Sequence, residues 1–244
     1  MSRPAPWLSA VVAQTAMEAR LTARRGENLL AMVGIPIGVL VFAGLFLSRP
    51  GALDLFLPGT LAVALVASGL VNLGIATAYE RGYGVLKRLG GSPLGRSGLV
   101  AAKLSVVAAI AVAQVVGLVL VAAILGWRPE AGLSVPALAL ATVLGAAVFA
   151  GLGLVIAGTL RPEAALVVAN VLFLLALAFG GALAPIPNLP DPISTALRLL
   201  PVGALGEAFS AALGSGAGIG RPLVILVAWA VAAFALASRT FRWD

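Results

Sequence analysis

The 244-residue chain contains no cysteine and no histidine. Without cysteine it cannot form a disulfide, and the redox state of its compartment cannot be inferred. Without histidine it lacks the commonest metal and haem ligand and the usual acid–base group near pH 7. We therefore expect no catalytic site, no metal site and no resident cofactor in this chain, which argues against a membrane-bound enzyme.

Charge is also scarce. Only 10% of the residues are charged and 61% are hydrophobic, whereas a soluble domain has about 25% charged residues. A soluble fold of this size could not remove so much apolar surface from water. A lipid bilayer removes that difficulty, so the composition predicts an integral membrane protein.

Six long apolar stretches have no charged residue in their interiors. Each is close to the roughly 20 residues that a helix needs to cross the hydrocarbon core. A helix also satisfies its own backbone hydrogen bonds, as lipid requires. We therefore predict an all-α membrane domain over residues 28–239 with six transmembrane helices, near 28–48, 57–79, 104–126, 134–160, 164–184 and 221–239.

The sixteen basic residues predict the orientation. If the N-terminus is cytoplasmic, only Arg49, Arg128, Arg198 and Arg221 lie outside, and the other twelve lie on the cytoplasmic side. The positive-inside rule favours this arrangement, with both termini cytoplasmic. The net charge of +7 is then explained by topology, and we expect no nucleic acid as a partner.

Segments that flank the spans have their own character. Residues 1–27 form a cytoplasmic N-terminal segment whose amphipathic pattern predicts an interfacial helix. Prolines break the chain after the fifth span, and two short apolar segments follow at 193–200 and 202–213. We predict that they form an outer helical hairpin between spans 5 and 6. Residues 240–244 are expected to be a cytoplasmic tail.

The span interiors contain no ionisable residue, which argues against proton-coupled carriers and pumps. Their strongest polar side chains belong to Asn72, Gln114 and Asn170. One interpretation is that these three line a substrate path. The other is that they form hydrogen bonds between helices, which is common in membrane proteins.

The loop between spans 2 and 3 is the most informative segment. Glu80 and Arg81 end the second span, and Gly84 permits a sharp turn. Residues 85–89 then predict a short helix, with Leu86 and Leu89 apolar and Lys87 and Arg88 basic, before Pro93 begins the next segment. Such a helix suits docking into a groove of a soluble partner. A basic loop that only determines topology is the alternative.

This loop resembles the coupling-helix region of type-2 ABC export permeases, the membrane subunits of drug, antibiotic, polysaccharide and lipid exporters. The sequence Gly-Val-Leu-Lys-Arg-Leu is most similar to that of the daunorubicin-resistance-type drug export branch. The chain departs from the family at Gly82, where a second acidic residue is usual, and at Val85, where threonine is common. The matching positions are Glu80, Arg81, Gly84, Leu86, Arg88, Leu89, Pro93, Leu94 and Lys103, with further similarity at 57–59, 180–181, 200–201, 207–208 and 239–243.

The resemblance implies a permease subunit of an ATP-driven exporter. ATP and Mg²⁺ would be bound by a separate ABC ATP-binding subunit, present in two copies, because the chain has no Gly-x-x-x-x-Gly-Lys-Ser/Thr loop. A second permease subunit, identical or different, would complete the complex in a bacterial plasma (inner) membrane. The residues implied in coupling to the ATPase are Glu80, Arg81, Gly84, Leu86, Lys87, Arg88, Leu89 and Pro93.

The expected substrate is amphipathic or hydrophobic, such as a drug, an antibiotic or a lipid-like molecule, because the spans offer few charges. The alternative function is a stand-alone secondary carrier or channel. That function requires ionisable groups within the membrane or inverted repeats with broken helices, and neither is visible in the sequence.

Overall fold

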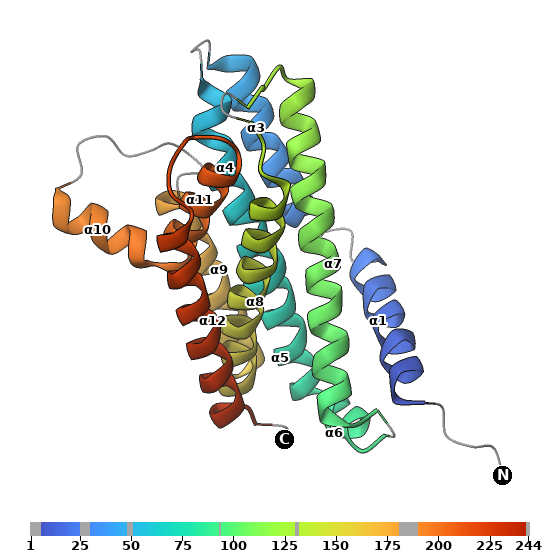
Figure 1. Cartoon of the computed structure of the whole chain (residues 1–244). Coiled ribbons are helices and arrows are strands. Elements are labelled where there is room, and N and C mark those ends of the chain that lie inside the picture. Colours follow the sequence, from blue (N-terminus) through green and yellow to red (C-terminus); the bar gives the residue numbers. More distant parts are fainter. Residues whose placement is uncertain are drawn as a thin grey trace.

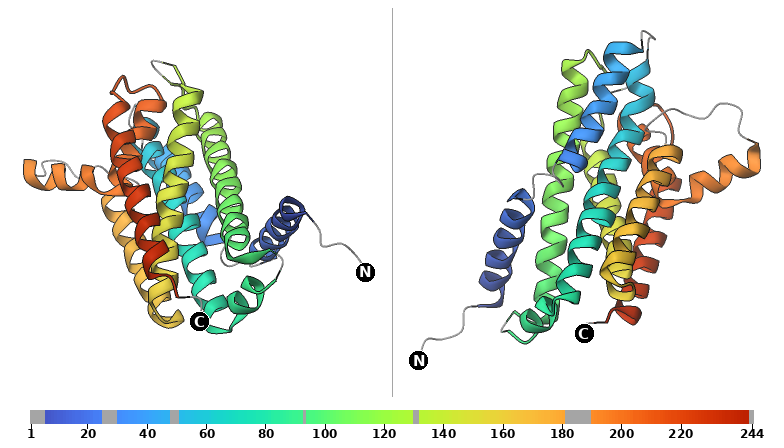
Figure 2. Two further views of the ribbon diagram at one scale, coloured as in Figure 1. Left: turned by 60° about the horizontal axis from the view of Figure 1, so that its bottom comes forward. Right: turned by 180° about the vertical axis from the view of Figure 1, so that it is seen from behind.

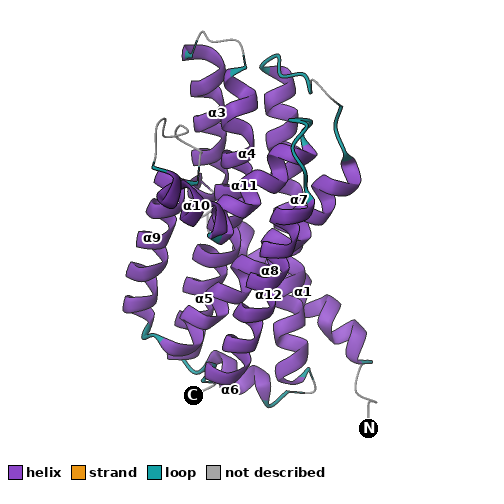
Figure 3. Ribbon diagram, turned by 60° about the vertical axis from the view of Figure 1, so that its left-hand side comes forward, coloured by secondary structure: helices purple, strands orange, loops and turns teal. Residues whose placement is uncertain are grey.

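The computed structural model describes residues 6–24, 30–47, 51–92, 94–129, 132–180 and 190–242. Within these ranges every regular element is a helix (Figures 1 and 3). The elements are α1 (Trp7–Arg24), η1 (Leu30–Gly34), α3 (Ile35–Phe46), α4 (Ala52–Leu65), η2 (Val66–Leu73), α5 (Gly74–Gly82), α6 (Val85–Gly90), α7 (Gly95–Ile124), α8 (Val135–Thr159), α9 (Pro162–Phe179), α10 (Asp191–Leu199), α11 (Pro201–Ala212) and α12 (Gly220–Thr240).

Five helical runs are long and apolar enough to cross a membrane. They correspond to the second to sixth predicted spans: the continuous run Ala52–Gly82 (α4, η2 and α5), then α7, α8, α9 and α12. The first predicted span corresponds to a shorter apolar helix, Met32–Phe46. The ends of the predicted range 28–48 lie outside the described residues, so six spans remain a prediction.

Helix α8 is the central packing element of the bundle. It contacts α12, η2, α5 and α11, and all four surround it in Figure 1. Glycines make the closest approach possible: a Cβ atom added to Gly153 would lie 2.5 Å from the carbonyl oxygen of Gly69 in η2. The backbones of η2 and α8 are therefore in direct contact at the middle of the second span.

The two short helices predicted between spans 5 and 6 are present, but they differ in burial. Helix α10 has no buried residue and projects away from the bundle in Figure 1. Helix α11 packs against α4, α8 and α12, and its Phe209 is fully buried. Only α10 therefore has the exposed position expected for a helix at the outer leaflet.

The N-terminal helix α1 lies beside α7 and outside the main bundle (Figure 2). Val11 faces the protein, whereas Trp7, Leu8 and Val12, which are also apolar, are exposed. The exposed apolar face suits a helix at a membrane interface. Its membrane position and the sidedness of both termini remain predictions.

Candidate functional site: the α6 end of the bundle

Helix α6 connects α5 to α7 at the end of the bundle where α1 and the C-terminal residues also lie (Figure 2). The turn that precedes it depends on Gly84, whose φ of +71° lies in the left-handed region. Glycine adopts this conformation without the steric cost that a side chain would add. The short helix predicted at 85–89 is thus present as Val85–Gly90.

The two faces of α6 have different roles in the packing. Leu86 is only 1% exposed and belongs to a small apolar cluster with Val11 of α1 and Leu94, Leu99 and Ala102 near the start of α7. Lys87 and Arg88 are exposed, and Leu89 is partly buried at the edge of the cluster. The apolar face therefore fixes α6 to its own chain, and a cationic face remains accessible.

An ionic cluster, which comprises Glu18, Glu80 and Lys103, holds three helices together next to α6. The Lys103 ammonium lies 2.7 Å from Glu80 of α5 and 3.1 Å from Glu18 of α1. The lysine side chain is 3% exposed, so both carboxylates compensate a nearly buried charge. The ionic cluster joins α1, α5 and α7.

Arg81 joins the end of α5 to the end of α8. Its guanidinium donates hydrogen bonds to the carbonyl oxygens of Gly158, at 2.6 Å, and of Leu160. The last carbonyls of a helix lack partners within the helix and carry partial negative charge, so a cation is favourable there. The backbone N–H of Arg242 also donates to Gly158, at 3.2 Å, which brings the C-terminal segment to the same point.

The three polar residues within the spans do not meet at one place. Asn72 and Asn170 line a common pocket of about 200 Å³, together with Met32 and Phe173. Asn170 is exposed on α9 and its amide donates to the carbonyl of Leu166 in its own helix, at 2.8 Å.

Gln114 is 6% exposed and lines a different, largely apolar pocket of about 380 Å³ between α7 and the first apolar helix. Its amide donates to the Met32 carbonyl at 2.9 Å. In an α-helix that carbonyl would accept the N–H of residue 36, which proline lacks. Gln114 therefore makes a hydrogen bond between two apolar helices, as the second interpretation of these polar residues expects.

The family model described as ABC-2 family transporter protein matches residues 8–239, which is nearly the whole chain. The chain belongs to the ABC-2 transporter family. A comparison with curated proteins gives no match. Membership makes this ABC-2 permease a transport subunit that works with an ABC ATP-binding subunit, and ATP is hydrolysed by that separate subunit.

Gly82 of the ABC-2 permease, where the resemblance would place a second acidic residue, lies close to another helix. A Cβ atom at this position would lie 2.8 Å from the Cγ atom of Pro162, at the start of α9. A second acidic side chain would require the connection between α8 and α9 to move.

Glu18 was not among the predicted coupling residues, and Lys103 was noted only as a matching position. The sequence gives a weak indication of both residues: Glu18 is the only acidic residue in α1, and Lys103 directly precedes an apolar stretch. A lysine that becomes buried needs an anionic partner. Pro93, which was predicted as a coupling residue, lies outside the described residues.

Proposed function

We propose that this permease belongs to an ATP-driven exporter, and that its α6 is the helix on which the ATP-binding subunit docks. The observation that supports this proposal best is the division of α6 into a buried and an accessible face. Leu86 is fixed in the apolar cluster, while Lys87 and Arg88 face outward without an ion pair among the described residues. A rigidly held cationic face suits an acidic groove on a soluble partner.

The contacts around α6 suggest how ATP-dependent movement would reach the spans. A displacement of α6 would act on α1 and α7 through the Leu86 cluster, and on α5 through Glu80. Arg81 would transmit the movement to α8, the central helix of the bundle. This is a two-state bundle biased by a docked element, in which the ATPase supplies the difference in free energy between the states.

The substrate is proposed to be amphipathic or hydrophobic, and its direction of movement outward. The pocket lined by Asn72 and Asn170 is the better candidate for the substrate path, because Gln114 is engaged in supporting the Met32 carbonyl. Most of α9 and α12 is exposed and apolar, which suits contact with lipid or with a second permease subunit. Two permeases with two ATP-binding subunits, in a bacterial plasma membrane, remain the proposed assembly, and the daunorubicin-type branch the proposed relationship.

Charge reversal on α6 tests the coupling assignment. The Lys87→Glu/Arg88→Glu variant should lose most co-purification with the ATP-binding subunit and most substrate-stimulated ATP turnover, yet insert normally in the membrane. Arg161→Glu is the matched control, because Arg161 is exposed at the same end of the bundle and outside α6. Normal ATP turnover in the α6 variant would show that α6 is not the docking helix.

The same preparation distinguishes the secondary-carrier alternative. We expect the permease reconstituted in vesicles without its ATP-binding subunit to move no substrate in response to an ion gradient. Gradient-driven movement by the permease alone would favour the carrier and refute the ATP-driven mechanism.

A further inference from the structure

A pocket of about 380 Å³ lies between α7 and the first apolar helix, Met32–Phe46, which pack side by side (Figure 1). Its volume falls within the roughly 300–1,000 Å³ that small-molecule sites occupy. Every residue that lines it is apolar except Gln114. The proposed coupling route through α6 does not use this pocket, which shares only Met32 with the pocket at Asn72 and Asn170.

Gln114 has a hydrogen-bond acceptor that no described residue satisfies. Its side-chain nitrogen donates to the Met32 carbonyl, and a carbonyl can only accept, so this contact distinguishes the nitrogen of the amide from its oxygen. The oxygen, Oε1, is buried and accepts no hydrogen bond from the part of the chain that the structure describes. A buried polar atom without a partner is unfavourable, particularly in lipid, where no water replaces the missing donor.

The space beside this amide is large enough for a ligand to reach it. Gly117 lies three residues from Gln114, on the same face of α7, and also lines the pocket. A Cβ atom added to Gly117 would meet nothing within 4 Å. The terminal torsion of a glutamine side chain is soft, so Oε1 can turn toward a donor here while one of the two N–H groups keeps the Met32 contact.

The depth of Gln114 in the membrane restricts which donor can reach it. The residue lies eleven positions after Lys103 and ten before Ile124, in the middle of the apolar part of α7. At 1.5 Å per residue this is about 15 Å from either end, which is half the thickness of the hydrocarbon core. Only the acyl chains of phospholipids reach that depth, and they have no donor. A charged donor would be costly there.

The pocket is accessible from the surface that faces lipid. Val33 lines the pocket and is 37% exposed, so the pocket reaches the surface of the chain. On α7, the apolar side chains of Val116 and Leu120 are more than half exposed at a similar depth. A molecule dissolved in the bilayer can therefore enter without passing through water.

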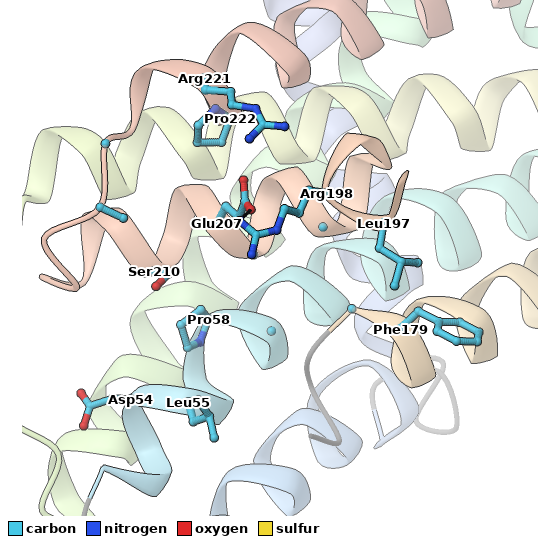
Figure 4. Close-up of a pocket in the computed structure, with 16 residues that line it drawn as sticks. Asp54, Leu55, Pro58, Phe179, Leu197, Arg198, Glu207, Ser210, Arg221 and Pro222 are labelled. Carbon is cyan, nitrogen blue, oxygen red and sulfur yellow. Dashed lines mark ion pairs between the residues drawn. The ribbon is translucent and has the colours of Figure 1, made fainter. Parts of the chain in front are cut away.

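A larger pocket, of about 600 Å³, lies at the far end of the bundle from α6, but its charged groups do not converge on one point (Figure 4). Arg198 pairs with Glu207 at 3.3 Å, and Asp54 and Arg221 lie on opposite sides of that pair. The pocket beside Gln114 differs, because its single polar side chain is buried and has an unused acceptor.

We propose that the pocket beside Gln114 binds an apolar molecule that carries one hydroxyl group. The hydroxyl would donate to Oε1 of Gln114, and the apolar body would lie along Gly117 between the two helices. A neutral hydroxyl satisfies the acceptor without bringing a charge into the membrane. The inference goes beyond the proposed export function, because binding here requires neither ATP nor the ATP-binding subunit.

Photolabelling of the purified full chain in phosphatidylcholine nanodiscs tests the assignment. The probes are a diazirine-bearing decanol and its methyl ether, which has the same apolar body but no donor. At equal concentrations in the membrane, the alcohol should label the α7 peptide that contains Gln114 saturably. Its half-saturating concentration should be about three- to tenfold lower than that of the ether, as expected for one hydrogen bond to a buried acceptor.

Two variants identify the pocket and the acceptor. Gly117→Leu fills the pocket and should abolish saturable labelling of the α7 peptide. Gly38→Leu is the matched control, because it adds the same side chain at an open position of α3 outside the pocket, and it should label as the wild type does. Gln114→Leu should bring the alcohol to the level of the ether. The comparison of the two probes is made on the wild-type protein, so the test does not depend on whether Gln114→Leu folds.

The outcomes that would overturn the proposal are distinct. Equal labelling of the wild type by the alcohol and the ether would exclude recognition of a hydroxyl and leave a pocket for acyl chains. Undiminished labelling of Gly117→Leu, or equal losses in Gly117→Leu and Gly38→Leu, would show that the pocket is not the site. Labelling that never saturates would reduce the effect to partition into the bilayer. None of these results bears on ATP turnover, so failure here is separate from failure of the α6 assignment.

Discussion

Replacement of Lys103 by methionine should release α1 from the bundle. The methionine keeps most of the length of the side chain and suits a position that is 3% exposed. It leaves Glu18 and Glu80, which are 13% and 17% exposed, as two carboxylates without their shared cation. The two like charges would then repel each other in a site that water reaches poorly.

The size of the effect follows from this geometry. Removal of one partner from a buried ion pair costs about 3–5 kcal/mol, because a charge is left uncompensated in the interior. We expect about 3 kcal/mol for Lys103→Met, at the lower end of that range, since both carboxylates retain some contact with solvent. A change of about 1.4 kcal/mol is a factor of ten in an equilibrium, so local opening should increase roughly a hundredfold.

Hydrogen exchange measured by mass spectrometry resolves this change along the chain. Amides of α1 should exchange about a hundred times faster in Lys103→Met, because α1 is held mainly by α7 and the ionic cluster. Peptides of α12 should be unaffected, since none of the ion pairs of the cluster reaches it. Lys87→Met is the matched control, because it removes the chain's other lysine from an exposed position nearby.

A triple variant distinguishes the effect of uncompensated charge from the effect of lost packing. Lys103→Met with Glu18→Gln and Glu80→Gln removes all three charges, and most of the protection of α1 should return. The reasoning would be refuted if Lys103→Met left exchange in α1 unchanged. It would also fail if the triple variant were as labile as the single one, because uncompensated charge would then not be the cause.

Three further substitutions address the same network and the central helix. Arg81→Ala should lower the stability of the bundle in thermal unfolding by about 2 kcal/mol, through loss of two charge-assisted hydrogen bonds, whereas exposed Arg161→Ala should be nearly neutral. Leu86→Ala should lower the free energy of unfolding by about 2–4 kcal/mol, because it leaves a cavity in the apolar cluster. An unchanged melting temperature would contradict the burial of this residue. Gly153→Ala should lower the free energy of unfolding by about 1–3 kcal/mol through overpacking. Gly117→Ala, whose added methyl group would meet open space, should be neutral or stabilising. Equal effects of the two substitutions in denaturant titration would argue against the close helix contact.

Five of the six spans were predictable because lipid imposes a strong rule on composition, but the helix ends were not. The second span was predicted to begin at residue 57, and the helix begins at Ala52. Asp54 interrupts the apolar stretch, yet an acidic residue is favourable in the first turn of a helix. Similarly, α7 begins at Gly95 and includes Lys103, although the apolar stretch begins after that lysine. Charge therefore indicates where an apolar stretch ends, whereas backbone hydrogen bonding decides where a helix ends.

Tertiary contacts explain what the sequence could not reveal. The segment that forms α11 is too short to span, and its burial depends on space that Gly145 of α8 leaves for Leu205. The short helix α6, which is the proposed coupling helix, was predicted from its turn glycine and its residue pattern. Its attachment was not, because Glu18 and Lys103 are 85 residues apart and nothing in their local sequences pairs them.

The arrangement of fixed contacts constrains how movement can pass through the permease. At the α6 end, Glu80 and Arg81 attach α5 to α1, α7 and α8 by charged groups, which are directional and resist sliding. In the middle of the same continuous helix, η2 meets α8 at Gly69 and Gly153 with almost no space between the backbones. A displacement of α6 is therefore expected to be transmitted along the continuous Ala52–Gly82 helix, and Asp54 at its far end would move relative to α11 and α12. The geometry thus links α6, the proposed coupling helix, to the opposite end of the bundle through one continuous helical run.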